Sequence, residues 1–267
     1  MPFTALIMAA QRKNEVNPLA VANGVSHKCL MDMDGLPMIQ RVYDSLAGSQ
    51  HIGRIIISID DAAALDDIAV IQDGVASGKA EISVSGDNPF ASVLAALDDA
   101  SLFPVIVTTG DNALHTTEII DYYCEKLLKS DCDVSVGFTN ETDIHPEYLA
   151  KLKEGKAPHR FRDGRYSNCN LFGLRTIKAI HSAKAFEGGG QFGKKKIRFF
   201  KAFGLVNLLI YKYGLLSLDA AFNRLSSRFG VKFEAIMMPF PEAPIDVDNP
   251  NDEALCRKLL AARRAKG

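Results

Sequence analysis

Residues 105–111 have the sequence VIVTTGD, and this stretch indicates how the chain folds. Its apolar, β-branched residues are typical of a strand buried on both faces of a parallel sheet, and a helix is predicted after it, at 115–130. Ligands of open α/β sheets bind at the carboxyl ends of such strands. We therefore expect Asp111 to lie in a ligand crevice, after Gly110, which allows a sharp turn. The alternative is a carboxylate that only closes a turn or caps the helix.

The remaining sequence alternates predicted strands with predicted helices. Strands are predicted at 4–9, 54–60, 81–85, 134–138, 168–174 and 231–238, and helices after Pro37 and at 62–71, 90–97 and 219–229. Repeated units of this length predict an α/β fold, with a Rossmann-like, mostly parallel sheet flanked by helices. The polar stretch 139–166 is interpreted as a flexible insertion over the site, because long loops are commonly lids or binding loops.

Composition and charge exclude several classes of function. The chain has 267 residues, with 31 basic and 32 acidic side chains, and its net charge of −1 argues against a nucleic-acid partner. Five cysteines without C-x-x-C spacing predict neither a disulfide framework nor a zinc site. Because the first residues lack a charged region and a cleavage site, no signal peptide is predicted and a cytoplasmic enzyme is expected.

The loop after the first strand carries basic residues at informative positions. Arg12 begins it, and Lys28 follows after a further polar stretch. A strand, a loop with a cation and a second cation beyond it are typical of a cradle for nucleotide phosphates. Taken singly, Arg12 is equally consistent with a surface cation, and Lys28 with a solvated loop lysine.

Four short motifs in order resemble the signature of the MobA-like nucleotidyltransferases. That family has L-A-A-G-x-G-x-R, then K-x-L and G-x-P-[ML], and near its end D-[IV]-D-T-P-x-D. The corresponding segments here are IMAAQR at 7–12, KCL at 28–30, DGLPM at 34–38 and IDVDNPND at 245–252, with further matches at Ser85-Gly86, Ser92 and 109–111. The matches extend over most of the chain, from Thr4 to Leu260. The nearest relatives implied are enzymes similar to molybdenum-cofactor guanylyl- and cytidylyltransferases.

The resemblance implies a fold, an activity and a set of site residues. The fold is that of the nucleotide-diphospho-sugar transferases (GT-A-like), and the activity is Mg²⁺-dependent transfer of a nucleotidyl group from an NTP, CTP or GTP favoured, to a small phosphorylated acceptor. Asp111 and Asp248 would hold Mg²⁺, and Asp246 would be a third ligand or lie behind them. Arg12 and Lys28 would neutralise the phosphates. The nucleotide-binding residues would be Ala9, Ala10, Gln11, Ser85, Gly86, Ser92 and Gly110. For the two serines and Gly86 the alternative is a plain turn and helix cap.

The phosphate loop departs from the family pattern. Gln11 replaces the first loop glycine, and Lys13 or Asn14 stands near the second. Glycine adopts positive φ and permits close approach to phosphate more easily than these residues. Either the loop follows another path, with asparagines or Asn23-Gly24 supplying the turns, or the protein binds nucleotides without catalysis. The retained cations and carboxylates favour an active enzyme. A glycosyltransferase of the same fold is disfavoured, because no carboxylate stands two positions before Asp111.

The second half is expected to bind the acceptor. We expect a single domain, 1–267, with a nucleotide-binding half at 1–138 and an acceptor-binding half at 139–267 that contains a helical insertion at about 190–230. Asn168 and Asn170 would face the acceptor from one side of a strand, unless they pair within a turn. Lys194 and Lys195 precede an apolar stretch, which indicates either an interfacial helix at a membrane or, the interpretation we favour, a helix packed on the domain or in a homodimer. The acceptor would be a phosphorylated alcohol, a sugar, or a cofactor or lipid head-group precursor.

Overall fold

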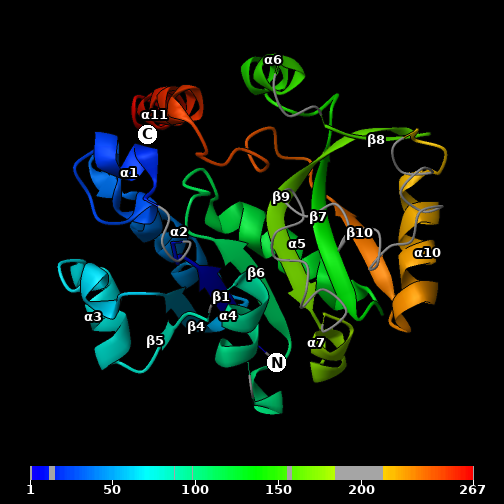
Figure 1. Cartoon of the computed structure of the whole chain (residues 1–267), viewed down its shortest axis with the longest axis horizontal. Coiled ribbons are helices and arrows are strands. Elements are labelled where there is room, and N and C mark those ends of the chain that lie inside the picture. Colours follow the sequence, from blue (N-terminus) through cyan, green and yellow to red (C-terminus); the bar gives the residue numbers. More distant parts are fainter. Residues whose placement is uncertain are drawn as a thin grey trace.

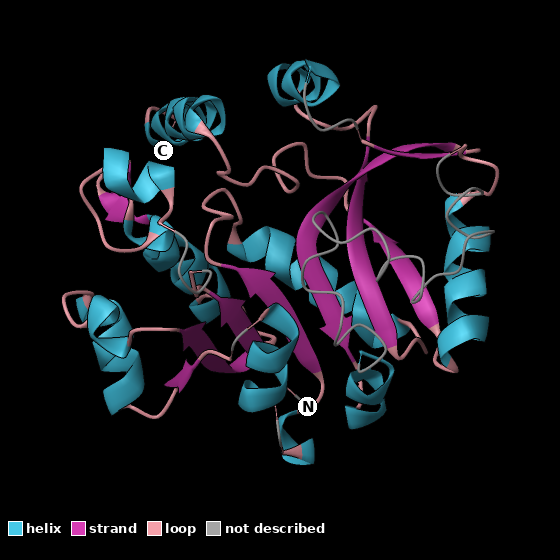
Figure 2. Cartoon of the chain, in the orientation of Figure 1, coloured by secondary structure: helices cyan, strands magenta, loops and turns pink. Residues whose placement is uncertain are grey.

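The computed structural model describes residues 2–11, 16–86, 88–97, 99–154, 158–183 and 213–266, and its centre is a sheet of eight strands (Figures 1 and 2). The order is β10-β7-β9-β6-β1-β4-β5, and β8 pairs with β9. The strands are β1 Phe3–Met8, β4 Ile52–Ile59, β5 Ala80–Val84, β6 Val105–Thr109, β7 Val134–Asn140, β8 His159–Phe161, β9 Gly164–Leu174 and β10 Phe233–Met237; β2 Asp32–Met33 and β3 Leu36–Pro37 form a separate hairpin.

Helices connect the strands and cover both faces of the sheet. They are α1 Pro18–Ala22, α2 Met38–Ala47, α3 Ala69–Ala76, α4 Pro89–Ala96, α5 Thr117–Lys129, α6 Pro146–Glu154, α7 Ile177–Ala183, α10 Leu218–Phe229 and α11 Pro250–Arg264, with short 3₁₀ turns η1 Lys28–Leu30, η2 Ala62–Leu65 and η3 Ala100–Leu102. None of the helices in the described ranges is long and apolar enough to cross a membrane.

The sheet is mostly parallel, as the sequence predicts. β1 pairs in parallel with β4 on one side and with β6 on the other, so the direction of winding reverses at β1. A ligand crevice forms at the carboxyl ends of strands at such a switch point. β9 is antiparallel and lies between β6 and β7, which brings a strand of the second half of the sequence beside β6.

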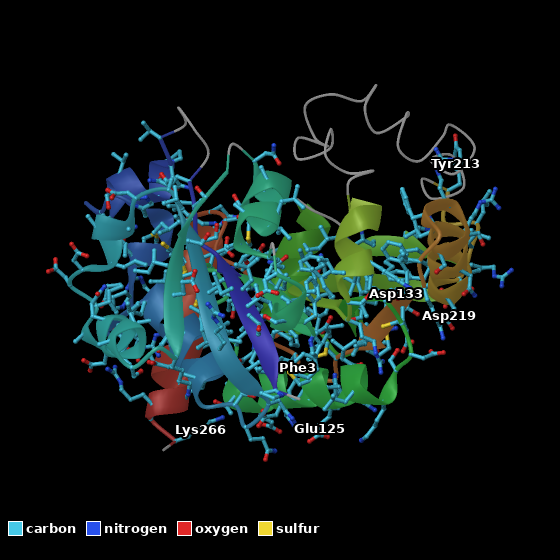
Figure 3. All side chains as sticks on the ribbon, turned by 90° about the horizontal axis from the view of Figure 1, so that it is seen from below. Phe3, Glu125, Asp133, Tyr213, Asp219 and Lys266 are labelled. Carbon is cyan, nitrogen blue, oxygen red and sulfur yellow. The ribbon has the colours of Figure 1, made fainter. Side chains whose placement is uncertain are left out.

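The alternation of side chains along β1 explains its continuous apolar sequence. Ala5 and Ile7 belong to a core cluster shared with α2, α3 and α5. Leu6 points to the opposite face and belongs to a second cluster, shared with α4 and α7. Side chains fill the space between the sheet and the helices on both faces (Figure 3). Strands buried on both faces are expected to be mostly apolar, which the sequences of β1 and β6 show, with Thr4 and Thr108 as buried exceptions.

A third apolar cluster, here called the cap cluster, lies over the carboxyl ends of the strands. It joins Leu114, Ile245 and Val247 to residues of α6 and α11, which lie together on one side of the sheet in Figure 1. These three residues are at most 1% exposed. The segments that carry Asp111 and Asp248 are therefore anchored by buried neighbours, although both aspartates belong to connecting loops.

The structure differs from the predicted secondary structure in two places, and a third prediction lies partly outside the described residues. The stretch 139–166 is not a flexible insertion: it contains the end of β7, α6, β8 and the start of β9. Its polar residues alternate with buried ones such as Ile144 and Tyr148, which pack in the cap cluster. A single helix at 62–71 is also wrong, because η2 is followed by α3. Of the helical insertion predicted at about 190–230, the structure describes the part from residue 213 onward. In this part, α10 packs Phe222 against Phe138 of β7, with the ring centroids 5.9 Å apart. The division into two functional halves remains a prediction.

Candidate active site at the switch point

Lys28 lies between two carboxylates that are far apart in the sequence. Its Nζ is 2.5 Å from Oδ2 of Asp111 and 3.3 Å from Oδ1 of Asp248. The side chains of Lys28 and Asp111 are 18% and 17% exposed, whereas that of Asp248 is 36% exposed. The three groups thus form a small, half-buried ion cluster that is open to solvent on the side of Asp248.

The charge of Lys28 is stabilised by this arrangement. Burial alone would lower the pKa of Lys28, but the two carboxylates outweigh it and hold the pKa above its usual value. Asp111 is engaged on both oxygens, because the Thr109 hydroxyl donates to its Oδ1 at 2.5 Å while Lys28 donates to Oδ2. A ligand that binds Asp111 must therefore displace or share one of these partners.

Close packing rather than backbone conformation explains the glycine before Asp111. A turn does begin at Gly110, as predicted, but its φ angle is not positive, so this turn does not require the left-handed conformation. A Cβ at this position would lie 3.2 Å from the Cβ of Cys29 and 3.4 Å from that of Ala9. The backbone of Gly110 continues the pairing with β1 through a hydrogen bond to Met8. Gly110 therefore lets the Lys28 segment approach the end of β6.

Asp248 is placed by the start of α11. Asn249 caps this helix, and its side chain accepts hydrogen bonds from the backbone N–H groups of Asn251 and Asp252. The Asp252 carboxylate, 7% exposed, accepts the N–H of Asp248 and the side-chain amide of Asn249. The Asp-Asn-Pro sequence at 248–250 therefore acts as a helix cap that also fixes the direction of the aspartate backbone.

Asn168 and Asn170 have different roles, because β9 bulges at Asn170, where it pairs with β7. The register against β7 shifts here, and Asn170 has a φ of 51°. The Asn168 side chain accepts the N–H of Asn170 at 2.8 Å and so holds the bulge. The Asn170 amide donates to Asp246 Oδ2 at 3.3 Å and to Asn112 at 3.2 Å. The prediction of two asparagines on one regular strand face is therefore wrong; bulges commonly redirect a side chain toward a site.

Asp246 is held by neutral donors from two elements. Besides Asn170, the hydroxyl of Tyr148 on α6 donates to its Oδ1 at 3.3 Å. Burial and the nearby Asp246 raise the pKa of Tyr148 well above its usual value, so the hydroxyl keeps its proton. Asp246 lies within a hydrogen-bond network, and among the described residues no group of three or more acidic, His or Cys side chains is arranged to hold a metal ion.

The start of the phosphate loop follows a path without glycine. The N–H of Gln11 donates to the Asp60 carboxylate at 2.9 Å, and its side-chain amide donates to the Ser26 carbonyl at 2.5 Å. Ala9 is 7% exposed and continues β1 through a bond from its N–H to Ser58. Ala10 follows it at the edge of the crevice. Arg12 lies outside the described residues, as do Lys194 and Lys195.

Ser85 and Gly86 lie in the connection between β5 and α4, and Ser92 of α4 bonds to this connection. The Ser92 hydroxyl accepts the N–H of Gly86 at 3.0 Å and donates to the Asn88 carbonyl at 3.1 Å. A Cβ on Gly86 would lie 2.6 Å from that of Ala91, so only glycine fits. Ser92 is 2% exposed and serves the turn, while Ser85 and Gly86 are partly exposed at the end of β5. A contact with the base remains a prediction for them.

Sequence reasoning missed four polar residues of the crevice: Thr109, Asn112, His115 and Tyr148. Asn112 and His115 are 0% and 3% exposed, and both connect segments that carry predicted site residues. Polar residues directly after a buried strand are a usable signal for Thr109 and Asn112. His115 and Tyr148 have no spacing that distinguishes them from surface or core residues.

Comparison with known proteins is consistent with this arrangement. The family model of the MobA-like NTP transferase domain matches residues 22–160, more than half of the chain. A search of curated proteins gives no match. Among solved structures, a hypothetical transferase from Thermus thermophilus has 21% identity and a TM-score of 0.72, and covers 95% of this chain and 100% of its own.

Two further structures share the fold at lower identity. CMP:2-keto-3-deoxy-manno-octonic acid synthetase complexed with CTP has 12% identity and a TM-score of 0.57, covering 98% of this chain and 100% of its own. The 4-diphosphocytidyl-2C-methyl-D-erythritol synthase from Anaerococcus prevotii has 12% identity and a TM-score of 0.57, covering 97% and 99%. The fold thus agrees with the family match, and the chain belongs to the MobA-like NTP transferase domain family, whose enzyme class is nucleotidyl transfer.

Proposed function

We propose that this protein is an Mg²⁺-dependent enzyme that joins the NMP of an NTP, CTP or GTP favoured, to a phosphorylated acceptor and releases pyrophosphate. The acceptor class is a phosphorylated alcohol, a sugar, or a cofactor or lipid head-group precursor. The observation that supports this best is the Lys28 ammonium between Asp111 and Asp248 at the switch point of the sheet. Nucleotidyl transfer requires a positive charge near the phosphates and carboxylates that hold a metal ion. This cluster would supply both in the same part of the fold.

The carboxylate pair fits Mg²⁺ when the nucleotide supplies further oxygens. Mg²⁺ is usually bound through one or two carboxylates together with substrate phosphates and water, rather than by a complete protein cage. In our proposal Asp111 and Asp248 meet this requirement, while Asp246, which accepts hydrogen bonds from Asn170 and Tyr148, is either a third ligand or lies behind them. When bound, Mg²⁺ would neutralise charge on the phosphates and on the leaving pyrophosphate.

The reaction requires an acceptor oxygen to attack the α-phosphorus while the bond to the bridging oxygen of pyrophosphate breaks. Negative charge grows on the leaving oxygens, so positioned cations supply most of the catalysis. In our proposal Lys28 turns from the carboxylates toward the phosphates, and Arg12 contacts the same group from the loop. Asp111 and Asp248 keep their places through Thr109 and the cap of α11.

The strand order suggests which side of the crevice each substrate uses. The nucleoside would lie over the carboxyl ends of β1, β4 and β5, near Ala10, Ser85 and Gly86. The acceptor would lie on the β9 side, near Asn170 and Asp246, since β9 and the segment before α11 meet there. A hollow of about 620 Å³ lies between the start of α6, the loop after β7 and the start of β9, and Glu141, Thr142 and Arg165 contribute to its lining.

A pyrophosphate-release assay tests the proposal. The four NTPs are combined with a panel of phosphorylated alcohols and sugars, with Mg²⁺ and with excess chelator. We expect one NTP and one acceptor class to give Mg²⁺-dependent release, and Asp111→Asn to abolish it without loss of the thermal unfolding transition. Nucleotide binding without release for any acceptor in the panel would contradict the proposed activity and favour the non-catalytic alternative.

A further inference from the structure

The segments that carry Asp111 and Asp248 are joined by three hydrogen bonds at alternating positions. The N–H of Val247 donates to the Asp111 carbonyl at 3.3 Å. The side chain of Asn112 donates to the Ile245 carbonyl at 3.4 Å. His115 Nε2 lies 3.0 Å from the carbonyl of Ala243. Residues 243, 245 and 247 are thus each tied to the loop between β6 and α5, beside which this segment runs toward α11 (orange in Figure 1).

His115 is a buried neutral donor in this ladder. A carbonyl only accepts hydrogen bonds, so Nε2 must carry the proton. Burial lowers the pKa of His115 to about 4, although the backbone groups of Ala243 and Cys169 favour the charged form. The imidazole therefore stays uncharged near neutral pH. The backbone of Cys169 on β9, one residue before Asn170, also lies near the imidazole, although Nδ1 makes no hydrogen bond to any of the described residues.

Asn112 is the second side chain in the ladder. Its Oδ1 accepts the Asn170 amide at 3.2 Å and lies 2.5 Å from the Thr109 hydroxyl, which also contacts Asp111. Its amide nitrogen donates toward Ile245. Because Asn112 is 0% exposed, water cannot replace these partners. No step of the proposed reaction uses Asn112 or His115, yet both are polar and fully enclosed.

We propose that His115 and Asn112 are positioning residues that fix the distance between the carboxylates of Asp111 and Asp248 and thereby set the affinity of the site for a divalent cation. This inference rests on the proposed function, in which these carboxylates hold the metal ion. A divalent ion needs both carboxylates within narrow limits of distance, and partners behind the ligands typically change metal affinity 10- to 100-fold when removed. Backbone pairing alone supplies only the Val247 contact, so the other two contacts depend on side chains.

The experiment compares substitutions that differ in one donor. The Nε2 amide of His115→Gln can reach the Ala243 carbonyl as the imidazole nitrogen does, whereas His115→Leu fills similar space without a donor. His115→Asn, too short to reach, is used if His115→Leu does not fold. The matched control is Tyr123→Phe, which removes a buried hydroxyl that lies 2.7 Å from Ser135 in the core between α5 and β7.

Binding of Mn²⁺ in the presence of a non-hydrolysable analogue of the preferred NTP is measured by electron paramagnetic resonance. We expect His115→Leu and His115→Asn to bind Mn²⁺ about tenfold more weakly, and His115→Gln and Tyr123→Phe to stay within about twofold of the wild type. The turnover of His115→Leu, relative to the wild type, should be higher at saturating Mg²⁺ than at low Mg²⁺.

Three outcomes separate the inference from the proposed function. Unchanged Mn²⁺ affinity in His115→Leu or His115→Asn would overturn the inference alone. Equal weakening in Tyr123→Phe would show that the effect follows from general loss of packing, which also overturns it. If the wild type binds no Mn²⁺ with any of the four NTP analogues, the proposed metal site itself is wrong.

Discussion

Replacement of Lys28 by glutamine should have opposite effects on metal binding and on nucleotide binding. Lys28 and a divalent ion compete for the same carboxylate oxygens, because Asp111 Oδ2 is 2.5 Å from Nζ and Oδ1 is taken by Thr109. Glutamine keeps much of the length and removes the charge. Without nucleotide, the variant should therefore bind Mn²⁺ more tightly than the wild type, while with nucleotide it should bind and react more weakly.

The magnitude follows from the contacts of the ammonium. A hydrogen bond to a charged group contributes about 1.5–3 kcal/mol, and the partial exposure of Asp248 favours the lower part of this range. A metal ion that no longer has to displace the ammonium should bind about tenfold more tightly, since roughly 1.4 kcal/mol corresponds to tenfold. Loss of the phosphate contact should lower turnover on the order of 10²-fold or more and raise the KM for NTP.

Isothermal titration of Mn²⁺ into nucleotide-free protein measures the first effect, and steady-state pyrophosphate release measures the second. Lys232→Gln is the matched control: it also breaks a lysine–aspartate pair, with Asp131, but this pair is exposed, and Lys232 directly precedes the edge strand β10. Equal or weaker Mn²⁺ binding in Lys28→Gln would refute the competition between Lys28 and the metal ion.

Three other predictions concern single residues. Asp111→Asn and Asp248→Asn should each lower turnover on the order of 10²-fold or more while the unfolding transition persists; near-normal activity of either with Mg²⁺ would remove it from the metal site. Gly110→Ala should destabilise the fold by about 1–3 kcal/mol in urea unfolding and lower kcat/KM, because the new methyl would meet Cys29 and Ala9; an unchanged midpoint would contradict the close packing. Burial lowers the pKa of His115 to about 4, below its unfolded value, so the unfolded state binds the proton first and stability falls as pH drops from about 6.5 to 4. This fall should be about 3 kcal/mol smaller in His115→Gln, measured by urea unfolding at pH 7, 5.5 and 4; equal pH dependence would show that His115 is not buried neutral.

The sequence was sufficient to predict the parallel core, and it singled out three charged residues that the structure brings together. The strand at 105–109 matches β6, and its apolar run reflects burial on both faces. Asp111 could be proposed because it follows a buried strand of a parallel sheet, and Lys28 because it follows a loop that carries another cation. Asp248 could be proposed only because residues 245–252 resemble the last motif of the family. That they contact one another directly was not predictable, since it depends on how Gly110 packs against Cys29.

Features that depend on contacts between distant segments could not be predicted. The antiparallel insertion of β9 between β6 and β7 follows from pairing over long sequence separations, to which local periodicity is insensitive. The bulge at Asn170 reverses the expected direction of one side chain for the same reason. His115 has no informative neighbours in the sequence, because the groups it contacts, Ala243 and Cys169, come from other segments.

The missing loop glycines and the carboxylates of Asp111 and Asp248 are separate features of this molecule. Gln11 is held by Asp60 and Ser26, whereas Asp111 and Asp248 are held by Thr109, the ladder to residues 243–247 and the cap of α11. None of the latter contacts involves the phosphate loop. A change in the loop therefore alters contacts with the nucleotide phosphates while the carboxylates keep their places. For this reason the departure at Gln11 should affect the KM for NTP more strongly than the binding of the metal ion. A loop variant such as Gln11→Gly should therefore change the KM for NTP and leave the affinity for Mn²⁺ unchanged.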